Sequence, residues 1–129
     1  MILLDTNALL WLYLDDPQLG PESRRQIASS SRVFYSAISV SEIAIKHLLR
    51  RLPLPGEKAF PRIFDDAGLK ELPFTAAHAR ALLHEPDLAR HDPFDRFLIA
   101  QAETERLDFL TADRTLLSLG KPWIHDAHL

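Results

Sequence analysis

The sequence contains no cysteine, only four glycines and a single methionine among its 129 residues. Without cysteine the chain can form no disulfide, thiolate metal site, thiol nucleophile or iron–sulfur cluster. Four glycines leave no room for a phosphate-binding P-loop or a dinucleotide fingerprint, which argues against NTP hydrolysis and NAD chemistry. A metal site in this chain must therefore use carboxylate, histidine or backbone ligands, a set that favours hard ions such as magnesium or manganese.

Long apolar runs and an excess of basic residues are also missing. No run approaches the roughly 18 residues that span a bilayer, and the apolar start of the chain carries Asp5 without a basic leader, unlike a signal peptide. We therefore expect a cytoplasmic protein without a membrane segment. The length favours a single domain over residues 1–129. The formal net charge of −3 provides no simple basic footprint for nucleic-acid binding.

Short apolar runs alternate with helical patterns along the chain. This alternation predicts an α/β domain with a mainly parallel sheet. The expected strands are residues 1–4, 33–35, 70–72, 108–110 and 123–124. The expected helices are residues 7–14, 21–29, 39–51, 75–84, 93–106 and 114–119, with a further helix interrupted by Pro61. Because ligands bind beyond the carboxyl ends of parallel strands, polar residues at those ends are the candidate site.

Four acidic residues fall at this edge of the expected sheet. Asp5 ends the first strand, Glu42 lies early in the helix after the second strand, and Asp113 follows the fourth. Asp95 begins a helix that returns antiparallel to the sheet, so its N-terminus lies at the same edge. Four converging carboxylates would repel one another unless a divalent cation neutralised them. The pattern therefore predicts a metal site that could activate water for hydrolysis of a phosphodiester.

Three of these acids have local structural interpretations as well. Glu42 could complete a capping box that begins at Ser39, and its spacing from Lys46 suits an ion pair one helical turn apart. Asp113 could cap the helix that follows it. Asp5 could support the turn after its strand, although a charge inside an apolar segment is costly when it is buried unpaired.

The segment HDPFDRFLIAQA, residues 91–102, contains two further candidates for a cap. Asp92 fits the N-cap of the expected helix, Pro93 fits the first helical position, and Asp95 fits the third. Negative charge in a first helical turn is also favoured by the helix dipole. The local pattern alone therefore leaves open whether these aspartates start a helix or hold a ligand.

Four segments share the order and spacing of a known family: MILLDTNALLW, SVSEIAIK, HDPFDRFLIAQA and FLTADRTL. They resemble the PIN domain and, more narrowly, the VapC-type ribonuclease toxins of bacterial toxin–antitoxin modules. The resemblance extends from residue 2 to about residue 125. It implies a PIN-like three-layer sandwich with a five-stranded parallel sheet flanked by helices. It also places the family's acids on the four residues found by position, namely Asp5, Glu42, Asp95 and Asp113, and leaves Asp92 as the helix cap.

The resemblance further implies a function. It points to a metal-dependent endoribonuclease with magnesium or manganese as cofactor, a homodimer, and a small antitoxin whose tail occupies the active-site groove. In our mechanistic hypothesis Asp5 and Asp95 are direct metal ligands, Glu42 orients or deprotonates the water, and Asp113 holds a second metal or an outer water. Candidate phosphate contacts are the basic residues beside the acids, Lys46, Arg96 and Arg114, which serve equally well as charges on helix surfaces.

Other functions fit less well. A receiver domain would need an acidic pair after the first strand, and a haloacid-dehalogenase-like phosphatase would need Asp-x-Asp there, whereas Asp5 is followed by Thr6 and Asn7. No G-x-S-x-G motif supports a serine hydrolase. A catalytically silent binding protein with the same fold stays open. The six histidines show no recognisable ligand spacing, and we expect them to be surface or loop residues: His47, His78, His84, His91, His125 and His128.

Overall fold

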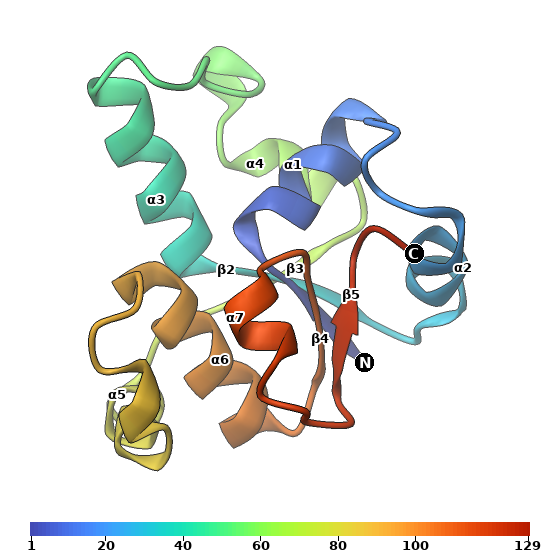
Figure 1. The fold of residues 1–129 in the computed structure, drawn as a ribbon. Helices are drawn as coiled ribbons and strands as arrows, with labels where there is room; N and C mark the ends of the chain where they lie inside the picture. Colours follow the sequence, from blue (N-terminus) through green and yellow to red (C-terminus); the bar gives the residue numbers. More distant parts are fainter.

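A five-stranded parallel sheet forms the centre of the protein, as shown by a computed structural model that describes all 129 residues (Figure 1). The strand order is β3-β2-β1-β4-β5, and every neighbouring pair is parallel. The predicted α/β class with a parallel sheet is therefore confirmed. The strands are β1 (Ile2–Leu4), β2 (Val33–Ser36), β3 (Lys70–Leu72), β4 (Asp108–Thr111) and β5 (Ile124–Asp126).

Helices cover both faces of the sheet (Figure 1). The α-helices are α1 (Thr6–Leu14), α2 (Pro21–Ser29), α3 (Ala37–Leu48), α4 (Arg62–Asp66), α5 (Ala76–Arg80), α6 (Pro93–Glu105) and α7 (Arg114–Leu117). Three short 3₁₀ turns, η1 (Glu57–Ala59), η2 (Ala81–His84) and η3 (Pro86–Leu88), complete the connections. No helix combines the length and the apolar character that crossing a bilayer requires.

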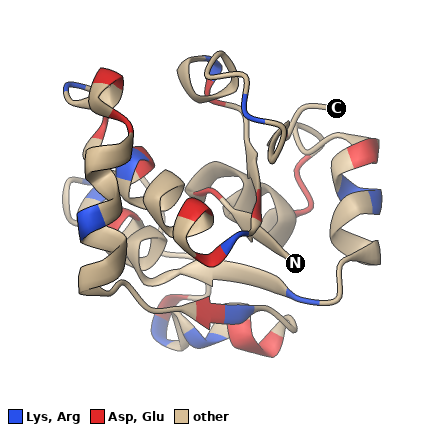
Figure 2. Cartoon of the chain, turned by 90° about the horizontal axis from the view of Figure 1, so that it is seen from below, with Lys and Arg blue, Asp and Glu red and all other residues tan.

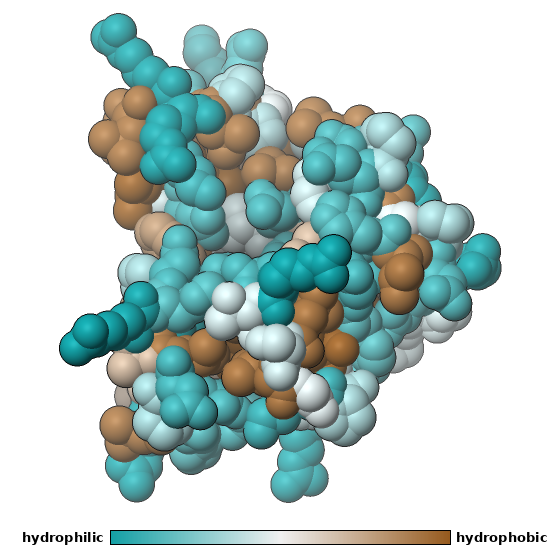
Figure 3. All heavy atoms as spheres, viewed as in Figure 1, coloured by the Kyte–Doolittle hydropathy of each residue, from teal (hydrophilic) through white to brown (hydrophobic).

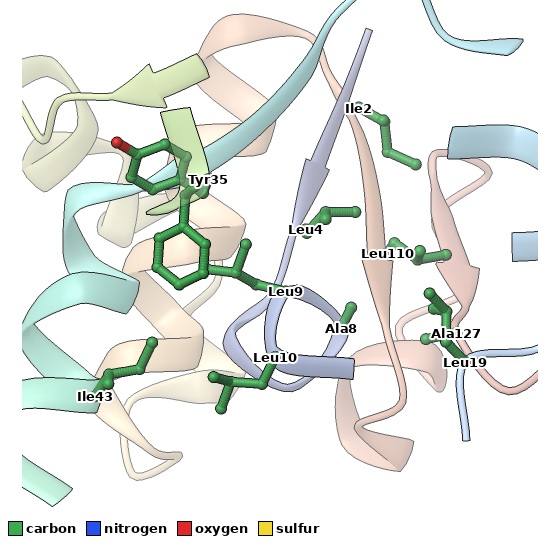
Figure 4. Packing of buried hydrophobic residues seen from close by; sticks show 11 residues of the cluster. Ile2, Leu4, Ala8, Leu9, Leu10, Leu19, Tyr35, Ile43, Leu110 and Ala127 are labelled. Atoms are coloured by element: carbon green, nitrogen blue, oxygen red, sulfur yellow. The ribbon is translucent and has the colours of Figure 1, made fainter. Parts of the chain in front are cut away.

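Two hydrophobic cores lie on opposite faces of the sheet, because successive side chains of a strand point to opposite faces. Ile2 and Leu4 of β1 pack with Leu9 of α1 and Tyr35 of β2 (Figure 4). Leu3, between them in the chain, instead joins the cluster formed by residues of β4, α6 and α7. Both faces of β1 are therefore buried, which explains why its sequence is a continuous apolar run.

The chain direction reverses at the centre of the sheet. From β1 the chain first builds outward through β2 to β3, and then crosses back to place β4 and β5 on the other side of β1. The carboxyl ends of β1 and β4 therefore form the topological switch point. In open α/β sheets this is where the ligand crevice lies. The residues that follow β1 and β4, Asp5 and Asp113, sit at this point.

Several helix bounds differ from the prediction. The helix expected from Ser39 begins two residues earlier, at Ala37, because the Ser36 hydroxyl accepts a hydrogen bond from Ile38 N at 2.9 Å and caps α3. The helix expected over residues 75–84 is divided into α5 and η2. The helix around Pro61 is likewise divided into η1 and α4, since proline supplies no backbone N–H.

Candidate active site

Asp5 lies between β1 and α1, and its side chain is hydrogen bonded to α1 and to the neighbouring strand β4. Its Oδ1 accepts a hydrogen bond from Ala8 N at 2.7 Å, which caps α1, and its Oδ2 accepts one from the Thr111 hydroxyl of β4 at 2.7 Å. Asp5 is only 4% exposed. The pKa of Asp5 is raised from 3.8 to about 6. Burial is the largest cause, the nearby charges of Glu42 and Asp113 add to it, and the two hydrogen bonds act in the opposite direction.

Glu42 points from α3 toward the start of α1 and is almost completely buried. The Thr6 hydroxyl donates to Glu42 Oε1 at 2.7 Å and is also hydrogen bonded to Ser39 Oγ at 2.9 Å. Lys46 Nζ lies 2.7 Å from Glu42 Oε2. The capping-box interpretation of Ser39 and Glu42 is therefore wrong, since both lie inside α3, whereas the expected pairing of Glu42 with Lys46 is present.

Asp92 and Asp95 have separate roles at the start of α6. Asp92 is exposed, and its Oδ1 accepts a hydrogen bond from Phe94 N at 2.8 Å, so Asp92 is the N-cap. Asp95, one turn into the helix, is partly buried among the other acids. Its pKa is raised chiefly by desolvation and then by the charges of Asp113, Asp5, Asp92 and Glu42. The structure thus brings Asp95 into the acidic group and keeps Asp92 as a cap.

Asp113 joins the same group from the start of α7. Its Oδ1 accepts a hydrogen bond from Leu116 N at 2.9 Å, so the capping interpretation and the site interpretation both hold for this residue. The Thr111 hydroxyl, which donates to Asp5, also accepts a hydrogen bond from Asp113 N at 3.0 Å. One threonine of β4 therefore fixes two of the acids relative to each other. Asp113 Oδ2 remains directed at the neighbouring acids and at His91.

His91 is a site residue that the sequence analysis missed. Its Nε2 lies 3.3 Å from Asp95 Oδ2 and 3.4 Å from Asp113 Oδ2, and these three atoms form a group with metal-binding spacing. His91 lies in a loop, as the sequence analysis expects, but its contact with the acids is not predicted there. The position one turn before Asp95 in the chain was a usable signal, because side chains at i and i+4 meet when the intervening residues start a helix.

The arrangement fits a divalent cation. Carboxylates converge from the ends of β1 and β4, from α3 and from the first turn of α6, and their charges help to raise the pKa values of Asp5 and Asp95. Such crowding is costly without a compensating positive charge, and oxygen donors suit magnesium or manganese. Because Asp5 and Asp113 each use one oxygen for a helix cap, their other oxygens face Thr111 and His91. The geometry can therefore hold an ion at the switch point.

The three basic candidates lie in different environments. Lys46 is half-buried and paired with Glu42, while Arg114 is exposed beside Asp113. Arg96 instead points away from the acids, and its Nη1 donates to Ala89 O at 3.1 Å near η3. Charged residues of both signs are spread over the helices and loops, without a basic face (Figure 2). Only Lys46 and Arg114 are therefore placed where they could meet a ligand beside the acids.

Comparison with known proteins decides the family. The PIN domain family model matches residues 2–122. The chain belongs to the PIN domain family. No curated protein matches this PIN domain. Among solved structures, it is 26% identical to FitAcB from Neisseria gonorrhoeae, with a TM-score of 0.62 and coverage of 88% of each chain.

Two further solved structures share the PIN fold at lower identity. VapBC2 from Rickettsia felis, bound to a DNA fragment from its promoter, is 15% identical with a TM-score of 0.67, and the match covers 98% of this chain and 97% of the other. VapC20 from Mycobacterium tuberculosis, a sarcin–ricin loop cleaving toxin, is 18% identical with a TM-score of 0.56, covering 97% and 99%. The predicted resemblance is confirmed at the level of family and fold.

Proposed function

We propose that this PIN domain is a metal-dependent endoribonuclease and the toxin of a toxin–antitoxin pair. The observation that carries the proposal is the convergence of Asp5, Glu42, Asp95 and Asp113 at the switch point of the sheet. Burial and mutual repulsion make this group unfavourable for folding by itself. Such strain is typical of a functional site, where pKa values are perturbed by burial and like charges.

Each of the four acids has a separate role in the proposed hydrolysis of a phosphodiester. A bound magnesium or manganese ion would supply a Lewis acid and favour deprotonation of water. Asp5 and Asp95 would bind the ion directly, and Asp113 would provide a further carboxylate beside it. Glu42 is fixed by Thr6 at one oxygen and by Lys46 at the other, so its carboxylate is oriented to position the attacking water and accept its proton.

RNA is the substrate that we propose. The formal net charge of the chain is −3, and the four acids contribute −4 to it. The rest of the chain is therefore slightly positive. Lys46 and Arg114 flank the acids and are our candidates for phosphate contact, whereas Arg96 is engaged with the loop at Ala89. Support for RNA also comes from the neighbour VapC20, whose described substrate is the sarcin–ricin loop.

A small antitoxin and a second copy of the chain are the proposed protein partners. Large apolar side chains are exposed on α3 at Ile45, Leu48 and Leu49, and on α1 at Tyr13 and Leu14. Figure 3 shows brown hydrophobic spheres gathered over the α3 region. Exposed apolar patches of this kind are typical of protein interfaces. Several of the solved neighbours are themselves toxin–antitoxin complexes, which supports an antitoxin as one occupant.

Incubation of the purified protein with RNA tests the nuclease proposal. We expect cleavage with Mg²⁺ or Mn²⁺, none in EDTA, and a loss of at least about 100-fold in the Asp5→Asn variant, because it removes a ligand charge while keeping the side-chain shape. Asp92→Asn is the matched control, since asparagine also caps helices and the exposed Asp92 is the N-cap of α6. Cleavage that persists in EDTA or in Asp5→Asn contradicts the mechanism.

The same assay separates the alternatives. A catalytically silent PIN-fold binding protein would leave RNA intact with either metal while still binding an antitoxin. A phosphatase of the Asp-x-Asp kind would release phosphate from a phosphomonoester, but here the position two residues after Asp5 is the exposed Asn7 of α1. Intact RNA under all metal conditions would favour the silent binding protein over our proposal.

A further inference from the structure

The loop before α6 holds His91 firmly at the edge of the acidic site. His91 N donates to Leu88 O at 2.9 Å, and Leu88, the last residue of η3, is buried in the core. On the other side, Asp92 caps α6 and fixes the chain where it enters the helix. The imidazole is mostly buried as well, with 20% of the side chain exposed. The backbone therefore presents His91 to the acids from an anchored position.

The His91 ring is close to two carboxylates without being hydrogen bonded to either. Nε2 lies 3.3 Å from Asp95 Oδ2 and 3.4 Å from Asp113 Oδ2, yet this buried nitrogen has no hydrogen-bond partner. A buried polar nitrogen without a partner is unfavourable, and each such case calls for an explanation. Coordination of a cation would give this nitrogen a partner.

The separations agree with ligands that share one cation. Nitrogen and oxygen ligands lie at about 2.0–2.2 Å from Mn²⁺-sized or smaller divalent ions. Two ligands at that distance, at angles between octahedral and tetrahedral values, are themselves separated by about 2.8–3.6 Å. Both measured separations from Nε2 fall in this interval. The three donor atoms also come within 4.8 Å of one another, as one coordination sphere requires.

We propose that His91 is a nitrogen ligand of the cation at this site and that it favours manganese over magnesium. This inference rests on the proposed function, because it assumes a cation among the acids. Magnesium prefers oxygen ligands and keeps its waters, whereas imidazole binds the transition metals more strongly. A site with Asp95, Asp113 and His91 therefore distinguishes the two ions in a way that four carboxylates alone would not.

A different role for His91 predicts the opposite result. If the imidazole were protonated and acted as a counter-ion for Asp95 and Asp113, it would compete with the metal. Removing it would then strengthen the binding of both ions. A purely structural role in the loop would leave the ratio of the two affinities unchanged. The sign and the selectivity of the effect therefore separate the three roles.

Calorimetric titration of the purified full chain with MnCl₂ and with MgCl₂ at fixed neutral pH provides the first test. In His91→Ala we expect Mn²⁺ affinity to fall by about 10- to 100-fold and Mg²⁺ affinity to change by less than about threefold. His91→Gln, which offers an oxygen donor, should retain Mg²⁺ and lose the preference for Mn²⁺. His84→Ala is the matched control, because His84 is exposed and pairs with Glu103 instead.

Pulsed electron paramagnetic resonance of the Mn²⁺-loaded protein provides the second test. A directly coordinated nitrogen couples to the Mn²⁺ spin, so we expect ¹⁴N modulation in the wild type and in His84→Ala and none in His91→Ala. Thermal melting without metal checks that each variant folds.

The outcomes separate this inference from the function on which it rests. Mn²⁺ binding without nitrogen modulation, or tighter binding of both ions in His91→Ala, overturns the assignment of His91 and leaves the nuclease proposal intact. Failure of the wild type to bind either ion overturns both. Nitrogen modulation that depends on His91, with selective loss of Mn²⁺ affinity, supports the assignment.

Discussion

Asp5→Asn should make the metal-free protein more stable at pH 8 although it abolishes the proposed site. The ionised Asp5 is buried beside other acids, and its pKa is raised from 3.8 to about 6. A raised carboxyl pKa means that the folded state binds the proton more tightly than the unfolded chain. Folding is therefore penalised increasingly as the pH rises from the unfolded pKa of 3.8 to the folded pKa of about 6, and above that pH the full penalty corresponds to about 3 kcal/mol for this shift.

The replacement recovers only part of this penalty. The asparagine Oδ1 can still accept from Ala8 N, so the cap of α1 is kept. The Thr111 hydroxyl, however, loses the carboxylate oxygen to which it donates at 2.7 Å, and an unmade buried hydrogen bond costs about 1–2 kcal/mol. We therefore expect a net gain of about 1–2 kcal/mol at pH 8. Below about pH 4, where both states of the wild type are protonated, the ionisation penalty is absent and the variant should be less stable than the wild type by about 1–2 kcal/mol, the cost of the unmade hydrogen bond.

Urea denaturation in EDTA at several pH values measures this effect. The stability difference between Asp5→Asn and the wild type should grow as the pH rises from about 4 to about 6 and then level off. Added Mg²⁺ should stabilise the wild type and leave the variant unchanged, because only the wild type binds the ion tightly. Asp92→Asn, whose side chain is exposed, should show a much smaller pH-dependent difference, because Asp92 is only a minor cause of the raised pKa of Asp95. A variant that is less stable than the wild type by the same amount at every pH would refute the reasoning.

Three further substitutions test other parts of the structure. Thr6→Val removes the donor to the buried Glu42 and should lower the free energy of unfolding by about 1–3 kcal/mol in urea denaturation. Valine has a similar shape, so the loss would not come from a packing defect. An unchanged unfolding midpoint would contradict this prediction. Gln101→Leu leaves the Ser36 hydroxyl without its partner in the core, and we expect a loss of about 2–3 kcal/mol in the same assay. Leu48→Glu, at an 80% exposed position, should leave stability within about 0.5 kcal/mol and weaken assembly with itself or an antitoxin, as measured by light scattering.

The positions of the acids could be predicted because they depend on strand ends. An apolar run that stops at Asp5, and another that stops shortly before Asp113, place both residues at the carboxyl edge of a parallel sheet. Asp95 could be placed because its helix returns antiparallel to the strands. These inferences need only the order of elements and the direction of the chain, and both can be read from hydrophobic patterning.

The contacts within the site could not be predicted in the same way. Ser39 and Glu42 looked like a capping box, but their partner is Thr6, more than 30 residues earlier, and no local pattern reports such a pairing. The Ser36 cap starts α3 at Ala37, so Ser39 and Glu42 lie inside the helix and cannot form its cap. His91 was missed because its approach to the acids depends on a loop with no periodic pattern. Tertiary packing decided each of these cases, and local propensity did not.

The strand order also determines when the site can form during synthesis. A nascent chain that has emerged as far as β3 already carries Asp5 and Glu42, but its central strand β1 has only one of its two neighbours. The second neighbour, β4, is followed within two residues by Asp113, so pairing of β4 with β1 delivers the last acid at the same time. The pairing of the central strand and the assembly of the acidic centre are therefore completed in the same late event. A partly synthesised chain that ends before β4 has an incomplete sheet and no assembled acidic centre.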